Sequence, residues 1–176
     1  MLRTERLLLR NWKDSDYAPF AAMNADPQVM EFFPKLLTRE ESDAMIDRIR
    51  NGIQENGFGW WAVEIPGVTD FAGFIGLSRP KFEAHFTPCI EIGWRLAKAF
   101  HGNGYATEGA LACLDFGFHE LKQEEILSFT AVPNKPSQRV MQKIGMTFAG
   151  EFDHPMLEKG HWLQRHVLYK KTAAEH

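Results

Sequence analysis

The sequence contains few residues that could cross-link the fold through disulfide bonds or bind a metal. Only two of its 176 residues are cysteines, Cys89 and Cys113. Two cysteines cannot form the disulfide framework of a small secreted domain, and no Cys-x-x-Cys pair with partnering histidines has the spacing of a zinc site. His161 and His166 are five residues apart, which does not place both on one helical face. We therefore expect reduced cysteines and no metal site.

Long apolar runs and an excess of basic charge are also missing. No segment approaches the roughly 18 apolar residues of a membrane span, and the N-terminus carries charges where a signal peptide needs an apolar stretch. The formal net charge is −3, whereas a protein that coats nucleic acid needs basic patches to neutralise phosphates. We expect a cytoplasmic protein, monomeric or homodimeric, with no membrane or nucleic-acid partner.

The residues that are present describe an ordinary globular chain, with 44% hydrophobic and 24% charged residues. This length and composition predict a single domain over residues 1–176. Helices are predicted after "KDSD", after the capping box of Thr38 and Glu41, and after Gly104 and Asn134. Short apolar segments predict strands at 6–12, 58–65, 71–78, 89–97, 125–132, 146–152 and 163–171. The pattern indicates an α/β fold with a mixed sheet of six to seven strands and about four helices.

A predicted strand, helix and strand over residues 89–132 form one right-handed crossover between parallel neighbours. The helix at 105–121 follows Gly102 and Gly104, whose lack of a Cβ lets backbone N–H groups approach a phosphate. The dinucleotide fingerprint requires Gly or Ala at position 107, which is Thr107 here, and no Lys-Ser/Thr pair completes a Walker loop. From these glycines alone, a pyrophosphate site and a tight turn without a ligand are equally good interpretations.

A second helix, capped by Asn134, is predicted to open onto the same crevice, where helix dipoles favour an anion. Lys135, Arg139 and Lys143 recur every fourth residue and form a basic stripe on it. The stripe suits phosphates at the mouth of the crevice. An ordinary solvated helix face explains the same spacing.

Three segments together resemble the GNAT superfamily of acyl-CoA N-acyltransferases. They are "LRTERLLLR" at 2–10, "EIGWRLAKAFHGNGYATEGA" at 91–110 and "NKPSQRVMQKIGM" at 134–146. Within the superfamily they are similar to ribosomal-protein N-terminal acetyltransferases of the RimJ and RimL type. The resemblance implies the GNAT fold, acetyl-CoA as cosubstrate and a primary amine as acceptor.

The resemblance also implies a coenzyme A site. The pyrophosphate is expected on the backbone of Gly102, Asn103, Gly104, Tyr105, Ala106 and Thr107. The pantetheine arm is expected along the strand near Trp94 and Leu96, with Asn134 and Ser137 touching the arm and the thiol region. Lys143 of the basic stripe is the further candidate for a contact with the phosphates. Ala99 departs from the Gln or Arg that the family often has there, leaving Lys98 or His101 to replace a phosphate contact. Met141 stands where many members carry the tyrosine that protonates the thiolate.

Acetyl transfer requires a neutral amine, so a proton must be accepted. Glu91 is the first candidate for the base, with Glu64 and Asp153 as alternatives. A structural carboxylate paired with Arg95, four residues further along the same strand face, is the other interpretation of Glu91. Ser137 is the candidate to donate a hydrogen bond to the leaving thiolate.

Aromatic residues are the candidates for the acceptor cleft, although most buried aromatics only build a core. Of Trp12, Phe32, Phe33, Trp60 and Trp94, the pair Phe32 and Phe33 is favoured because it lies in a loop between two prolines. The acceptor is predicted to be a protein N-terminus or a small molecule such as an amino acid, polyamine or antibiotic. A non-catalytic acyl-CoA sensor and a nucleotide-binding unit are the alternatives.

Overall fold

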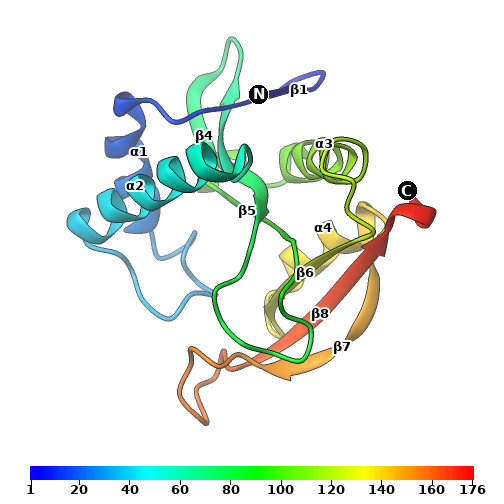
Figure 1. The fold of residues 1–176 in the computed structure, drawn as a ribbon. Coiled ribbons are helices and arrows are strands. Elements are labelled where there is room, and N and C mark those ends of the chain that lie inside the picture. The colour runs from blue at the N-terminus through cyan, green and yellow to red at the C-terminus, as the bar shows by residue number, and fades with distance from the viewer.

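A computed structural model describes all residues 1–176 and shows one mixed sheet between two pairs of helices (Figure 1). The eight strands lie in the order β1-β2-β3-β4-β5-β6-β8-β7. Every neighbouring pair is antiparallel except β5 and β6, which are parallel. The strands are β1 (Leu2–Arg3), β2 (Leu8–Arg10), β3 (Trp60–Ile65), β4 (Thr69–Ser78), β5 (Glu91–Leu96), β6 (Glu125–Ala131), β7 (Thr147–Asp153) and β8 (Arg165–Thr172).

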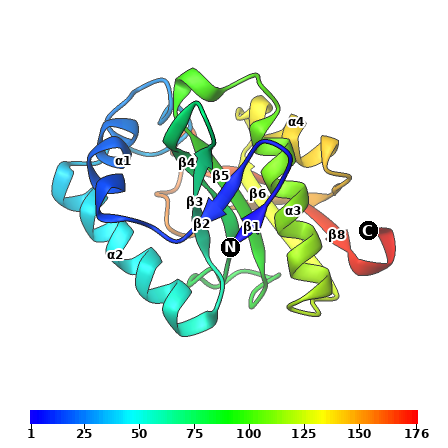
Figure 2. The same cartoon turned by 90° about the horizontal axis from the view of Figure 1, so that it is seen from above.

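The four α-helices are α1 (Tyr17–Asn24), α2 (Arg39–Asn56), α3 (Tyr105–His119) and α4 (Lys135–Lys143). Figure 2 shows α1 and α2 on one face of the sheet and α3 and α4 on the other. Each pair buries its own apolar cluster against the sheet, the larger one lying under α3 and α4. No helix is long and apolar enough to cross a membrane.

Local sequence explains where the helices begin and end. Thr38 and Glu41 form the predicted capping box at the start of α2, which ends at Gly57 in a left-handed conformation. The side chain of Asn134 accepts the N–H of Ser137 at the start of α4. Both features satisfy polar groups that the helix itself leaves free.

The mixed α/β class and the parallel crossover are confirmed. The strand count is eight because a short strand at Leu2–Arg3, which was not predicted, precedes the first predicted strand. Leu2–Arg3 and Leu8–Arg10 pair with each other, and the turn between them is held by the N–H of Thr4, which donates to the carbonyl of Leu7. The final pair of strands lies within a residue or two of the predicted ranges.

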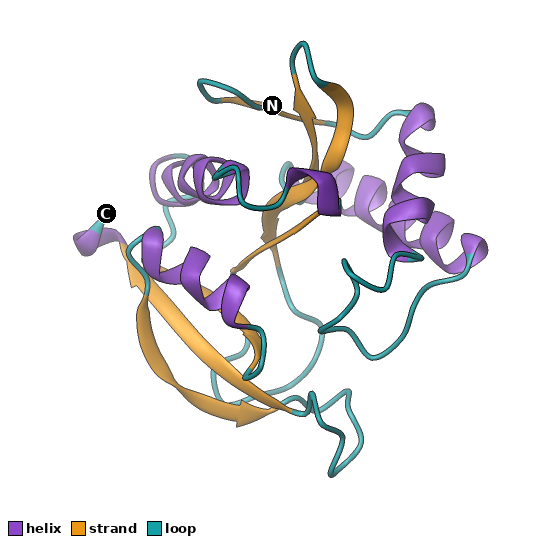
Figure 3. Cartoon of the chain, turned by 180° about the vertical axis from the view of Figure 1, so that it is seen from behind, coloured by secondary structure: helices purple, strands orange, loops and turns teal.

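The parallel pair β5 and β6 stays together only at its beginning. Glu91 opposite Leu127 is its single paired position, and beyond it the two strands diverge (Figure 3). The opening lies at the carboxyl ends of both strands, at the centre of the sheet. In an α/β sheet this is where a ligand gains access to free main-chain groups and helix N-termini.

Candidate active site

The opening between β5 and β6 exposes main-chain groups of both strands. The N–H of Leu127 donates to the carbonyl of Ile90 at 2.9 Å, and the Ser128 hydroxyl donates to the carbonyl of Ile92 at 2.9 Å. Because main-chain groups alternate in direction along a strand, the next groups on this edge of β5 belong to Trp94. No strand pairs with them, so the Trp94 N–H and C=O are available to an extended ligand.

The glycine turn before α3 presents a row of free donors at the top of this opening. Gly102 and Gly104 both have φ near +80°, which a residue with a Cβ adopts only with strain. The N–H groups of residues 102–107 have no backbone acceptor. Several N–H groups around a positive helix end form an anion site, so the turn fits a pyrophosphate.

Residues of the N-terminal hairpin brace this turn. Arg6 donates through Nη1 to the carbonyl of Asn103 at 3.0 Å and through Nε to Glu108 at 2.6 Å. Its guanidinium also lies 4.7 Å from the centre of the Tyr105 ring, and Thr4 donates to Glu108 at 2.5 Å. These contacts hold the N-terminal segment against the glycine turn.

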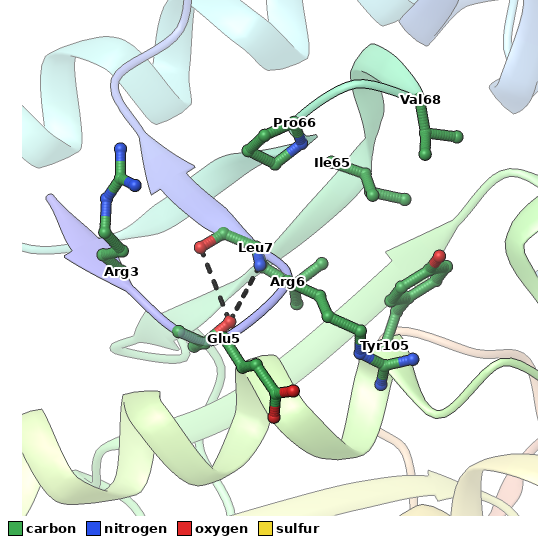
Figure 4. A pocket seen from close by; sticks show the side chains of 9 residues that line it. Arg3, Glu5, Arg6, Leu7, Ile65, Pro66, Val68 and Tyr105 are labelled. Carbon is green, nitrogen blue, oxygen red and sulfur yellow. Dashed lines mark hydrogen bonds between the residues drawn. The ribbon is translucent and has the colours of Figure 1, made fainter.

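A shallow hollow of about 320 Å³ lies beside this brace (Figure 4). It is lined by the turn between β1 and β2, the turn between β3 and β4, and Tyr105. Glu5 and Arg6 line it together, and Arg6 is already paired with Glu108. We assign this hollow no ligand.

The residues predicted on α4 lie at different distances from the opening. Asn134 and Ser137 lie at the helix N-terminus, where Asn134 Nδ2 also donates to Thr130 at 2.9 Å. Lys143 lies in the last turn, about 14 Å along the helix axis from Asn134, so a phosphate contact from it remains a prediction. Met141 is 1% exposed and packs in the core, which excludes this position as a proton donor.

Trp94 and Leu96 have their side chains on the α3 side of the sheet. Leu96 is 5% exposed in the large core, so only its backbone can face a ligand. His101, one of the two possible substitutes for the missing phosphate contact, is engaged through Nε2 with the carbonyl of Leu96 at 2.8 Å. The exposed Lys98 is the freer of the two.

Glu91 lies on the opposite face of β5, toward α1 and α2. Burial raises the pKa of its carboxyl to about 7, an effect partly opposed by the Ser78 hydroxyl, which donates to it at 2.6 Å. The alternative pairing with Arg95 does not form, because Arg95 donates instead to Asn24 Oδ1 at 2.7 Å. Glu91 is therefore a half-buried carboxylate without a cationic partner, at the closed end of the opening.

The two other candidate bases are already paired. Glu64 accepts hydrogen bonds from Arg10 at 2.8 Å and Lys13 at 3.3 Å, and the Arg10 contact is the main cause of its lowered pKa. Asp153 is exposed and pairs with Arg165 at 3.2 Å. A carboxylate held in ion pairs is a weaker proton acceptor, so Glu91 is the best placed of the three.

The predicted acceptor aromatics Phe32, Phe33 and Trp60 all lie on the same face as Glu91. The Phe33 ring lies 4.0 Å from the Arg95 guanidinium carbon, and Trp60 stacks on Phe74 at 5.0 Å. Phe32 contacts Trp162, with 6.5 Å between ring centres. Two other aromatics do not join them: Trp12 is a 5%-exposed core residue, and Trp94 faces α3.

A cluster of aromatic and imidazole rings completes this face and was not predicted. His154 and His166 lie 4.9 Å apart, and burial lowers the pKa of both, that of His154 to about 4. The phenylalanines packed around them are Phe82, Phe86, Phe129 and Phe152. Only the alternation of Phe152 with His154 along one strand edge hinted at this cluster, because its other members come from separate loops and strands.

One further histidine cluster lies at the other end of α3. Asp115, His119 and His176 have potential ligand atoms within 4.8 Å of one another. The residues are exposed, and the closest contact, between Asp115 and His119, joins an i, i+4 pair on the helix. Solvated groups of this kind commonly cluster without an ion, and the cluster has no connection to the glycine turn.

The sequence from residue 6 to residue 147 matches the model of the acetyltransferase (GNAT) domain. The chain belongs to the GNAT family. This GNAT protein is accordingly an acyl-CoA-dependent N-acetyltransferase, and the opening between β5 and β6 with its glycine turn is its candidate active site. The resemblance found in three sequence segments is thus confirmed at the level of the family.

Individual relatives and solved structures are similar to most of this chain. The uncharacterized protein YkkB of Bacillus subtilis is 32% identical over 149 residues, which cover 84% of this chain and 86% of YkkB. The crystal structure of a GNAT-family acetyltransferase from Bacillus anthracis covers 99% of both chains with a TM-score of 0.83 and 28% identity. RimJ of Mycobacterium smegmatis in complex with CoA-disulfide has a TM-score of 0.77 at 19% identity, covering 96% of this GNAT chain and 83% of RimJ, which supports the shared fold alone.

Proposed function

We propose that this protein transfers the acetyl group of acetyl-CoA to a primary amine by direct attack within a ternary complex. The observation that carries the proposal is the opening between β5 and β6, with free N–H groups at residues 102–107 above it and Trp94 main-chain groups along it. The turn supplies donors for a pyrophosphate, and the edge of β5 supplies strand-like partners for the pantetheine amides. Acceptor-side residues lie on the opposite face of β5, so the two substrates meet across this strand.

The chemistry replaces a carbon–sulfur bond by a carbon–nitrogen bond. Glu91 takes a proton from the ammonium group, directly or through a water, and the neutral nitrogen attacks the thioester carbonyl. The N–H of Trp94 is the available main-chain donor for the oxygen on which negative charge develops; donors of this kind are worth about 3 to 4 kcal/mol in other enzymes. The sulfur leaves as a thiolate, since the thiol is acidic enough to need no strict general acid. The second proton of the attacking nitrogen passes to this thiolate or to solvent, which leaves a neutral amide and free CoA.

Ser137 is the nearest candidate to stabilise that thiolate, because it lies at the start of α4 beside the opening. We expect Ser137→Ala to lower kcat by about 2- to 10-fold, the net value of one ordinary hydrogen bond. Steady-state kinetics with varied acetyl-CoA measure this. Unchanged kcat and unchanged KM for acetyl-CoA would remove Ser137 from the mechanism.

Gly104→Ala tests the pyrophosphate turn. Its φ of +81° is strained for alanine, and the new Cβ would lie 3.4 Å from Arg6 Nη2, so the row of donors shifts. We expect the KM for acetyl-CoA to rise about 5- to 20-fold. Gly57→Ala is the matched control, because Gly57 has φ +78° at the end of α2. An equal rise in both variants would count against the turn as the phosphate site.

The acceptor is proposed to be a small amine. The support is the contact between Phe32, in the loop before α2, and Trp162, in the loop between β7 and β8, because together these side chains bridge the acceptor face. A protein N-terminus, as in the RimJ and RimL type, is the other candidate and enters the test below.

Thiol release from acetyl-CoA in the presence of an amine panel tests the function. The panel contains amino acids, polyamines, aminoglycosides and short peptides with free N-termini. Amine-dependent thiol release with an acetylated product in the mass spectrum is the expected result. Thermal stabilisation by CoA without thiol release from any amine would instead indicate an acyl-CoA sensor, and stabilisation by NAD(P) but not CoA would indicate a nucleotide-binding unit.

A further inference from the structure

The acceptor face contains a buried cation without an anionic partner. Arg95 Nε is buried and has no hydrogen-bond partner. Its guanidinium carbon lies 4.0 Å from the Phe33 ring and 5.3 Å from the Phe74 ring, and Asn24, a neutral side chain, accepts from Nη1. No carboxylate forms a salt bridge with it, and burial lowers the pKa of Arg95 to about 10. An uncompensated buried charge is costly, so such a group is a functional candidate.

A second orphan donor lies on the same face. Trp60 Nε1 is buried without a partner and would be 3.7 Å from a Cβ at Gly93. Trp60 pairs with Gly76 and Gly76 with Gly93, so two glycines in one row across the sheet leave room for the indole ring. Since side chains on one strand face recur every second residue, Gly93 stands between Glu91 and Arg95. The indole donor thus lies between the candidate base and the cation.

We propose that Arg95 and Trp60 bind a carboxylate of the acceptor, which makes the acceptor an amine that also carries a carboxylate, of the amino-acid type. This inference rests on the proposed acetyl transfer and names its substrate class. The carboxylate accepts from Arg95 Nε and Trp60 Nε1, two buried donors that have no partner, while the amine faces Glu91. The rings of Phe33 and Phe74 keep water away from the ion pair and strengthen it.

The charge on this face favours a carboxylate over the other acceptor classes. A polyamine would place a second positive charge against Arg95, whereas a neutral amide would leave that charge uncompensated. The lowered pKa values keep His154 and His166 neutral at pH 7, so they neither attract the carboxylate nor repel the amine. Phe129 and its neighbouring rings present an apolar wall, which suits an amino acid with an apolar or aromatic side chain.

Matched substrates test the inference on the unaltered protein. Phenylalanine, phenylalaninamide and phenethylamine share the ring and the amine, and only phenylalanine carries a carboxylate. We expect kcat/KM for phenylalanine to exceed that of the other two by at least about 10-fold. Methionine and tryptophan with their amides extend the comparison. Equal or better acetylation of the amides, or preference for spermidine, would overturn the carboxylate site while leaving the acetyltransferase function intact.

Arg95→Gln tests the residue itself, with Arg79→Gln as the control because Arg79 also lies over an aromatic ring, that of Phe58. We expect Arg95→Gln to raise the KM for phenylalanine about 10- to 100-fold and to change that for phenethylamine less than about twofold. Arg79→Gln should change neither. Equal losses for both amines in Arg95→Gln would make Arg95 structural and overturn the proposal.

Binding separates the failure of this inference from the failure of the proposed function. Isothermal titration of phenylalanine into the protein with CoA bound requires no turnover. Heat of binding that is observed with phenylalanine but not with phenethylamine supports the carboxylate site. If no amine is acetylated in that case, only the proposed acetyl transfer is overturned. Absence of phenylalanine binding, together with acetylation of other amines, overturns only the carboxylate site.

Discussion

Replacing Glu91 by Gln is expected to lower kcat by about 100- to 1,000-fold, the contribution of a positioned general base. Glutamine keeps the shape of the side chain and an oxygen that can accept from Ser78, so the local packing is preserved. What it loses is the ability to take the proton of the amine. Steady-state turnover with saturating acetyl-CoA measures the effect.

The pH profile identifies Glu91 independently of the rate. Its pKa is raised from 4.5 to about 7 by burial, so the carboxylate form appears only as the pH passes through about 7. Turnover by the unaltered protein should rise through this range, before a second rise as the amine itself deprotonates. Glu91→Gln should keep only the second rise. A first rise that survives in Glu91→Gln would exclude Glu91 as the base.

Two carboxylates serve as comparisons for Glu91. Glu125→Gln alters an exposed strand carboxylate that lies 3.7 Å from Lys170, and its turnover should stay within about twofold of the unaltered protein. Asp153→Asn should behave in the same way. If Asp153→Asn instead shows the large loss, the base is Asp153 and the role of Glu91 is structural.

The substitution Glu91→Gln should also stabilise the fold at alkaline pH. In the folded state Glu91 holds its proton up to about pH 7, whereas in the unfolded chain it titrates near 4.5. The folded state therefore binds more protons between these values, and stability falls as the pH rises through this window. Urea unfolding at pH 8 should show Glu91→Gln to be more stable by about 1 to 3 kcal/mol. Lower stability of the variant at pH 8 would contradict the raised pKa.

Removing the carboxylate of Asp16 is expected to cost about 3 to 5 kcal/mol of unfolding free energy. Asp16 is 1% exposed and binds Arg10 through two hydrogen bonds of 2.8 and 3.0 Å. The other N–H groups of Arg10 donate to Glu64 and to the carbonyls of Asn11 and Asp70, so all five donors are used. In Asp16→Ala a buried guanidinium loses its main counter-charge and two of its acceptors.

Asp14→Ala is the matched control, two residues earlier in the same turn. Asp14 also pairs with an arginine, Arg50 at 2.7 Å, but its side chain is 91% exposed. Surface pairs of this kind contribute about 0 to 1 kcal/mol. Urea unfolding of both variants measures the difference. A loss in Asp16→Ala no larger than that in Asp14→Ala would contradict the structural role of the buried pair.

The buried pair of Arg10 and Asp16 also supports the acceptor face of the candidate active site. Asp16 directly precedes α1, and Asn24 at the end of α1 holds Arg95 through a 2.7 Å hydrogen bond. Asn24 Nδ2 in turn donates to Ser42 in the first turn of α2 at 2.9 Å. Loss of the Asp16 contacts at the start of α1 should therefore disturb the position of Arg95 on the acceptor face. The KM of Asp16→Ala for the amine should rise more than its KM for acetyl-CoA.

Local signals in the sequence were sufficient to predict the helices, the strands and the glycine turn. Capping by Thr38 and Asn134, the positive φ at Gly102 and Gly104, and the strand, helix and strand order depend on neighbouring residues. The free N–H row is also local, because it belongs to one turn and the helix that follows it. Each of these features lies within a short stretch of the chain, so three short segments were enough to identify the family.

The acceptor side depended on contacts between residues far apart in the chain. The sequence suggested Arg95 as a partner for Glu91, because strand alternation places both on one face, but a longer-range bond to Asn24, 71 residues away, takes the guanidinium instead. The meeting of Phe32 with Trp162 and of Phe82 with His154 likewise brings together separate loops.

The sequence by itself therefore determined the family, the order of the elements and the glycine turn before α3. Only the tertiary structure decided that Glu91 has no cationic partner, that Glu64 is held by Arg10, and that Arg95 and Trp60 retain unused donors. The physical reason is that burial and pairing set the pKa and the availability of a polar group, and both depend on which distant segments pack against it.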